Sequence, residues 1–182
     1  IPVQLFKGIE CSILSHSERS TDLPLKLAPL LDIVIGSVHT LPHLFQFQNR
    51  EQVTEKMIAA MVEPIDIIGH PCQEKSCPNL EPVVKKAAES GIAMELNYCS
   101  LHLKKANIKD TTEMLKLAVK YDCSISLGSD AHMSNELGRD DESKVLLNEL
   151  NFPPELIVNV SLESARTFVA SRKKIRQDNL TN

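Results

Sequence analysis

The sequence alternates short apolar runs rich in β-branched residues with longer amphipathic stretches, and this alternation strongly restricts the possible folds. Short runs that are apolar on both faces are typical of buried strands, and amphipathic stretches of ten or more residues are typical of helices. Five runs of the first kind are expected to be strands. They are residues 5–14, 31–38, 65–69, 92–96 and 123–127. Repeated β-α units predict parallel strands covered by helices, so the expected fold class is α/β.

Helices are expected between these strands, and two of them carry N-terminal signals. Asp110 followed by Glu113 is typical of a capping box, and Ser161 is a good N-cap residue. The expected helices are residues 50–62, 80–90, 110–121, 142–150 and 161–175. The basic residues 172–174 are expected to fray into solvent at the end of the last helix, and a further apolar run at 156–160 follows two prolines.

A doubly wound sheet and a closed barrel would both satisfy this order of elements. Full eight-stranded barrels usually take about 250 residues, and this chain has 182. With 42% hydrophobic and 24% charged residues, the chain can bury one core, so a single domain spanning residues 1–182 is expected. A barrel would therefore be incomplete.

Charge and cysteine content restrict the possible partners and the compartment. The net charge is −4 and the basic residues are scattered, so the sequence gives no footprint for nucleic acid. No run approaches the roughly 18 apolar residues of a membrane span. The 5 cysteines are an odd number in mostly apolar segments, which suits reduced thiols. A cytoplasmic protein that binds neither nucleic acid nor membrane is expected.

Polar residues of metal-ligand type follow or end the successive expected strands. Parallel β/α folds place their active sites at this edge of the sheet. The series is Glu10, His39, His70, Glu95, Asn97, Asp130 and His132. A mixture of imidazoles and carboxylates suits Zn²⁺, Mn²⁺ or Fe²⁺ better than Ca²⁺ or Mg²⁺. Three further histidines lie in polar or irregular contexts and are expected on the surface or in loops: His16, His43 and His102.

The ordered motifs GIE, IGSVH, IIGHP, MELN and GSDAH resemble those of the PHP (polymerase and histidinol phosphatase) domain family. The segment LNFPPELIVNVS followed by a closing helix is similar to the end of the YcdX-like phosphoesterases of that family, and the resemblance covers about residues 5–172. It implies a distorted (β/α)7 barrel with up to three metal ions. Glu10 would bridge two metals, and His39 and His70 would share one of them. Asp130 and His132 would each bind a further metal.

The chain departs from the family at its N-terminal end. The family begins with an HxH motif and a DH pair, and this sequence contains neither. Two explanations are open: the chain is the C-terminal portion of a longer barrel, which we favour, or it is a shortened homologue. A free-standing shortened chain would leave the edge of the first strand exposed, which is an aggregation liability. Pairing with a missing N-terminal segment or with a second copy of the chain could cover it.

The resemblance implies a hydrolase that cleaves a small phosphate ester with metal-activated water. Glu10, Asp130 and His132 would be catalytic, Glu95 and Asn97 would support the metal ligands, and Arg139 could bind phosphate, although a solvated loop position is the simpler interpretation. Two alternatives are a catalytically inactive metal-binding module, because ligands are missing, and a PHP nuclease, which the acidic charge disfavours.

Overall fold

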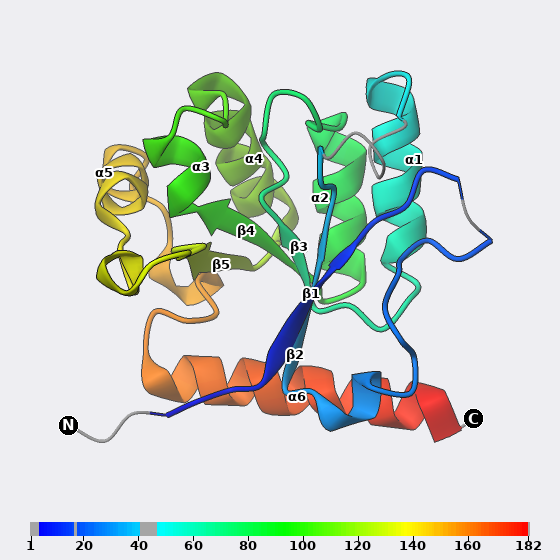
Figure 1. Cartoon of the computed structure of the whole chain (residues 1–182). Helices are drawn as coiled ribbons and strands as arrows, with labels where there is room; N and C mark the ends of the chain where they lie inside the picture. Colours follow the sequence, from blue (N-terminus) through cyan, green and yellow to red (C-terminus); the bar gives the residue numbers. More distant parts are fainter. Residues whose placement is uncertain (1–3, 17, 41–46, 182) are drawn as a thin grey trace.

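The computed structural model describes residues 4–16, 18–40 and 47–181, and it is built on a five-stranded, fully parallel sheet (Figure 1). The strands are β1 (Gly8–Ser12), β2 (Ile33–Ser37), β3 (Ile67–Gly69), β4 (Ala93–Asn97) and β5 (Ile125–Gly128). Each expected strand overlaps one of them, so the α/β prediction is confirmed. The first strand is shorter than expected, because its N-terminal part, with Leu5 81% exposed, lies outside the sheet.

The strands follow one another in the sheet in the same order as in the chain. A doubly wound sheet would reverse direction at a switch point, so that alternative is excluded for the described residues. Strand β1 does not pair with β5 in the described part of the chain, and the sheet is therefore open there. The apolar run 156–160 lies against β5 through a parallel bridge between Ile157 and Ile125.

Three helices cover one face of the sheet. They are α1 (Arg50–Ala60), α2 (Leu80–Glu89) and α4 (Ile108–Tyr121), with α2 packed between the other two (Figure 1). Buried strand residues such as Val34, Ile68 and Met94 belong to the same apolar core as the helix residues Met57, Val84 and Leu115. This face is the hydrophobic side of the sheet.

The remaining helices differ more from expectation. Helix α5 (Asp141–Glu149) was expected, α3 (Tyr98–His102) was not, and three short 3-10 turns, η1 (Ala28–Leu30), η2 (Ser134–Glu136) and η3 (Pro154–Leu156), complete the structure. Helix α4 begins two residues earlier than the expected capping box, because the Asn107 side chain accepts a hydrogen bond from Lys109 N at 2.9 Å. The prediction for Ser161 is confirmed, since its Oγ accepts from Ser164 N at 3.1 Å.

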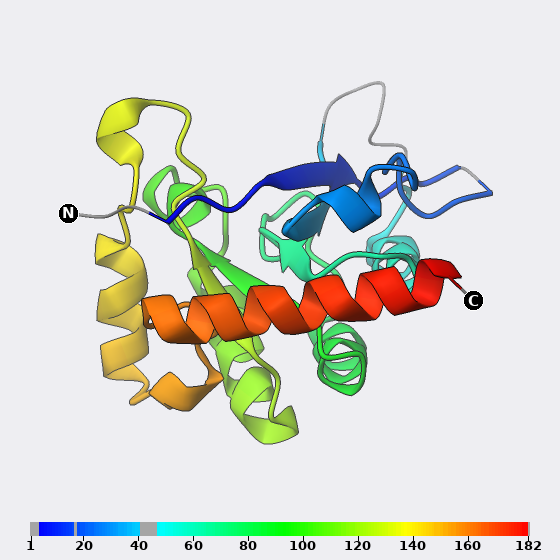
Figure 2. The same ribbon diagram turned by 90° about the horizontal axis from the view of Figure 1, so that it is seen from below.

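Helix α6 (Leu162–Thr181) runs across the end of the sheet at which the strands begin (Figures 1 and 2). The expectation that it frays at residues 172–174 is wrong. The helix continues to Thr181, and Arg172 is buried rather than solvated. None of the described helices combines the length and the apolar character needed to cross a membrane.

Asp66, just before β3, fixes α6 to the sheet. Its side chain is fully buried, and its Oδ1 accepts from Arg172 Nε at 3.2 Å. Its Oδ2 accepts from Arg176 Nη1 and from Val34 N, the latter at 2.8 Å. The two guanidinium groups also donate to main-chain carbonyl oxygens at the same end of the sheet: those of Ala28, Leu31, Asp32, Ile65 and Ser90. A buried carboxylate is thus paired with two buried cations, and every other nitrogen of the two guanidinium groups donates to a carbonyl oxygen.

The substitution Asp66→Asn is expected to lower the free energy of unfolding by about 3–5 kcal/mol, because it leaves two buried arginines without their counter-charge. Chemical denaturation monitored by circular dichroism measures this. Asp32→Asn is the matched control, since Asp32 pairs with Lys173 in a partly exposed ion pair at 2.8 Å, for which about 1 kcal/mol or less is expected. Equal losses in the two variants would contradict the structural role given to Asp66.

Candidate metal centre

The register of the sheet places its polar residues on one face. Glu10 lies opposite Ile35, and Ser12 lies opposite Ser37. Because side chains alternate between the two faces of a strand, Glu10, Ser12 and Ser37 share the face that the helices do not cover. Glu95 of β4 lies on this face as well. The ends of β1, β2 and β3 lead to one rim, where the candidate ligands meet.

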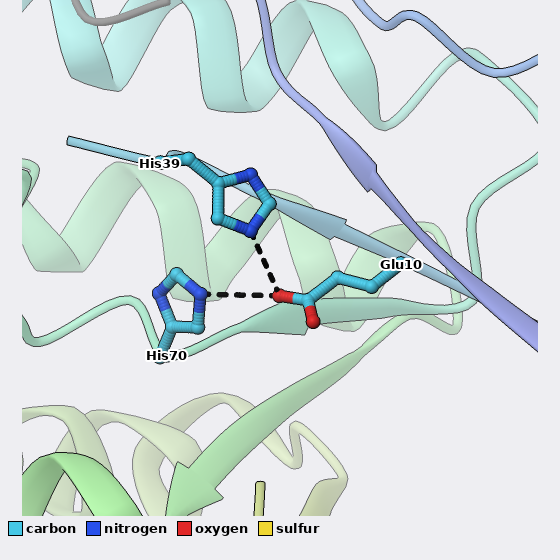
Figure 3. A group of neighbouring side chains, drawn as sticks. All are labelled: Glu10, His39 and His70. Atoms are coloured by element: carbon cyan, nitrogen blue, oxygen red, sulfur yellow. Dashed lines mark hydrogen bonds and ion pairs between the residues drawn. The ribbon is translucent and has the colours of Figure 1, made fainter. Parts of the chain in front are cut away.

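Glu10, His39 and His70 come together at this rim (Figure 3). Glu10 Oε1 lies 3.1 Å from His70 Nε2 and 3.3 Å from His39 Nε2. One ligand atom from each side chain lies within 4.8 Å of the other two. Ligand atoms in a tetrahedral zinc site are 2.0–2.2 Å from the metal, so they lie about 3.4 Å apart. The three side chains therefore fit a shared transition-metal ion.

The electrostatics of the group favour a negative carboxylate. Hydrogen bonds from His39 and His70 hold the pKa of Glu10 well below its usual range, although burial opposes them. Burial lowers the pKa of His70, but the hydrogen bond to Glu10 and the charges of Glu95, Glu10 and Asp130 outweigh burial and raise it. Without an ion, Glu10 and His70 stabilise one another, because their hydrogen bond favours the ionised carboxylate and the protonated imidazole.

Each histidine is held differently. His39 Nδ1 lies 3.1 Å from Ser12 Oγ, and this contact directs the opposite ring nitrogen toward Glu10. The ring of His70 is buried, and its Nδ1 has no hydrogen-bond partner among the described residues. Ser12 was not predicted as a site residue. Its position two residues after Glu10 was the available signal, because that spacing places both side chains on one face of a strand.

Glu95 contacts the backbone of His70 rather than its ring. Its Oε2 accepts from His70 N at 2.7 Å and from Asn97 Nδ2 at 3.1 Å. Burial raises the pKa of Glu95, while these two hydrogen bonds lower it in part. His70 has a positive φ of 30°, which is rare for a residue with a side chain. A Cβ atom at Gly128 would clash with Glu95 Oε1, so glycine at this position leaves room for the carboxylate.

Asp130 and His132 lie outside the group of three. Asp130 follows β5, has a φ of 51°, and is close enough for its charge to raise the pKa of His70. The His132 side chain is 74% exposed, and its Nδ1 lies 2.9 Å from the Asp130 carbonyl oxygen. The structure therefore brings together three of the five predicted ligands, and the metal roles of all five remain predictions.

Arg139 is engaged with other protein groups. It donates to Asp141 Oδ2 from Nε and Nη2 at 3.0 and 2.8 Å, and its guanidinium lies 5.3 Å from the centre of the Tyr98 ring. Its phosphate-binding role also remains a prediction. Asn97 caps α3 by accepting from Ser100 N at 2.7 Å. His16 and His102 are exposed as expected, and His43 lies outside the described residues.

Comparison with known proteins relates the chain to phosphatases. It is 36% identical over 170 residues to a protein of Caldicellulosiruptor saccharolyticus named "Probable phosphatase", a match that covers 92% of this chain and 69% of the relative. It is 32% identical over 179 residues to "Probable phosphatase NT01CX_1282" of Clostridium novyi, covering 96% of this chain and 71% of the relative. No protein-family model matches the chain.

A solved structure shares the fold. A chain in the cryo-EM structure of an archaeal ribonuclease P with mature tRNA superposes with a TM-score of 0.63 over 98% of this chain and 73% of its own length, at 19% identity. This likeness concerns the fold alone. The identity to the bacterial relatives over most of both chains is what assigns the protein, and the chain belongs to the family of these probable phosphatases.

Proposed function

We propose that the protein is a metal-dependent phosphoesterase that hydrolyses a small phosphate ester with water. The observation that carries the proposal is the Glu10–His39–His70 group, whose spacing fits one metal ion, in a chain related to phosphatases. The motifs that resemble the PHP family, and its YcdX-like branch, support a PHP-type barrel. The singly wound order of the strands is consistent with part of such a barrel.

Glu10, His39 and His70 would hold the first ion, with zinc the best match and manganese or iron also suited to imidazole and carboxylate ligands. A bound ion of this kind lowers the pKa of water and neutralises the charge on phosphoryl oxygens. Asp130 and His132 would serve further ions, up to the three that the resemblance implies. In this proposal Glu10, Asp130 and His132 are the catalytic residues.

The protein's own residues would keep the ligands in place. Ser12 orients the ring of His39, and Glu95 holds the backbone of His70 in its strained conformation. Asn97 in turn donates to Glu95, so β4 supports a ligand that follows β3. Arg139 would have to exchange its bonds to Asp141 for a phosphate in order to bind substrate.

The substrate and the partners follow from charge and from the open sheet. A net charge of −4 favours a small phosphorylated substrate over a nucleic acid, which would require a basic groove.

Strand β1 lies at the edge of the sheet and pairs only with β2 in the described residues. An N-terminal segment or a second copy of the chain would cover this edge by adding a strand.

Metal binding is the first test. Isothermal titration with Zn²⁺ is expected to show tight binding to the metal-free protein. His70→Ala is expected to weaken it about a hundredfold, because it removes one of three protein ligands. His16→Ala is the control, because His16 is exposed and lies outside the group of three. Equal binding by wild type and His70→Ala would exclude the site.

Turnover is the second test. The metal-loaded protein is expected to release phosphate from 4-nitrophenyl phosphate, and Glu10→Gln is expected to lower kcat/KM at least a hundredfold, because the carboxylate would both bind metal and face the substrate. Removal of the metal with a chelator should abolish the activity, and added Zn²⁺ should restore it. Stoichiometric metal without turnover would instead support the alternative of an inactive metal-binding module.

The support from Glu95 can be tested through Gly128. Gly128→Ala would place a methyl group against Glu95 Oε1, displace the carboxylate from His70 N, and lower zinc affinity about ten- to a hundredfold. In a double-mutant cycle, Gly128→Ala should have little further effect once Glu95 is alanine. Additive losses in zinc affinity would show that Gly128 acts independently of Glu95.

A further inference from the structure

A cleft of about 310 Å³ opens at the same rim as the candidate metal centre. It is lined by Thr40, Gln73, Glu74, Lys75, Lys104 and Lys105, and we refer to it as the lysine cleft. Thr40 directly follows His39, and the backbone N–H of Gln73 donates to the His70 carbonyl oxygen at 3.4 Å. The cleft therefore begins one residue from one candidate ligand and one turn from another.

The lysine cleft carries an excess of positive charge. Its three lysines outnumber Glu74 and leave a local charge of +2, in a chain whose net charge is −4. None of the three lysines forms an ion pair with an acidic residue in the described part of the chain. By contrast, Glu81 neutralises Lys120 and Asp140 neutralises Lys144. A concave surface with a net positive charge attracts anionic ligands.

The two loops that carry these lysines are fixed to each other. Gln73 and Ala106 form an antiparallel bridge, and Glu74 N donates to the Lys105 carbonyl oxygen at 3.0 Å. The Gln73 side chain also donates to Ser100 Oγ at 3.0 Å, which joins the loop after β3 to α3. Lys75 and Lys105 therefore project from a braced backbone, so a ligand would have to order only their side chains.

We propose that the lysine cleft binds a second anionic group of the substrate. The preferred substrate would then be a small phosphate ester with a further phosphate or carboxylate, its scissile phosphate at the metal centre and its second anion in the cleft. This inference rests on the proposed function. The compact ammonium groups of lysine suit either anion, and a charge of +2 matches a phosphate dianion better than a carboxylate.

The test compares esters that differ only in the distal group: propyl phosphate, propane-1,3-diol bisphosphate and 3-phosphooxypropanoate, with six-carbon analogues to vary the reach. The metal-loaded wild type is expected to show at least tenfold higher kcat/KM for the bisphosphate than for propyl phosphate, with the carboxylate ester between them. Lys104→Ala/Lys105→Ala should reduce this ratio about tenfold. Lys85→Ala/Lys116→Ala removes the same charge from exposed positions on α2 and α4 and should leave the ratio unchanged.

Binding of uncleavable analogues separates this inference from the proposed function. By isothermal titration, the wild type is expected to bind propane-1,3-bisphosphonate at least tenfold more tightly than propylphosphonate, and the cleft variant should lose that preference. If the wild type prefers the bisphosphonate but hydrolyses none of the esters, the anion site is supported and the proposed phosphoesterase activity is refuted. Turnover with no preference, or a preference that both double variants lose equally, would overturn the lysine cleft as an anion site.

Discussion

The buried contact between Asp66 and the two arginines of α6 determines where the ends of the strands lie. Asp66 bonds through its side chain to Val34 N of β2, its main-chain carbonyl accepts from Ala93 N of β4, and its carboxylate holds Arg172 and Arg176. One residue therefore links three neighbouring strands to the helix that crosses their N-terminal ends. Because strands are stiff over a few residues, fixing this end also fixes the register at the opposite rim, where the candidate ligands lie.

The position of the candidate ligands follows from the alternation of side chains between the two faces of each strand. Glu10, Ser12, Ser37 and Glu95 occupy alternate positions of paired strands, so a slip of one residue in any pair would turn ligands toward the helices. Glycines on the same face leave the space that these polar groups need. Gly69 faces Ser37, and Gly128 faces Glu95. The face that carries the candidate ligands thus combines polar residues and glycines with a few apolar residues such as Ile35 and Ile67, while the opposite face packs against the helices.

The sequence predicted the strands well because buried parallel strands are short, apolar and separated by amphipathic helices, as residues 65–69 and 92–96 are. It also predicted that five ligands would meet, since parallel strands end at one rim. Glu10, His39 and His70 do meet, whereas Asp130 and His132 lie outside the group. The sequence did not predict the burial of Arg172, because basic residues near the end of a helix are usually solvated. The partner that buries Arg172 is Asp66, which is distant in the sequence. The sequence could not predict that Glu95 would bind the backbone of His70, because that contact depends on a positive φ.

This last contact connects the fold to the chemistry of the rim. His70 and Asp130 both follow strands, and both have positive φ, a conformation that costs a residue with a side chain about 1–3 kcal/mol. The Glu95 carboxylate offsets that cost at His70 by accepting its backbone N–H, and it remains buried because Gly128 has no side chain. Burying Glu95 costs free energy, but the buried carboxylate stabilises the backbone conformation of His70 that directs its imidazole toward Glu10. The same turn leads through Gln73 to the loop that carries Lys75, so the conformation at His70 sets the geometry of the candidate metal centre and of the lysine cleft together.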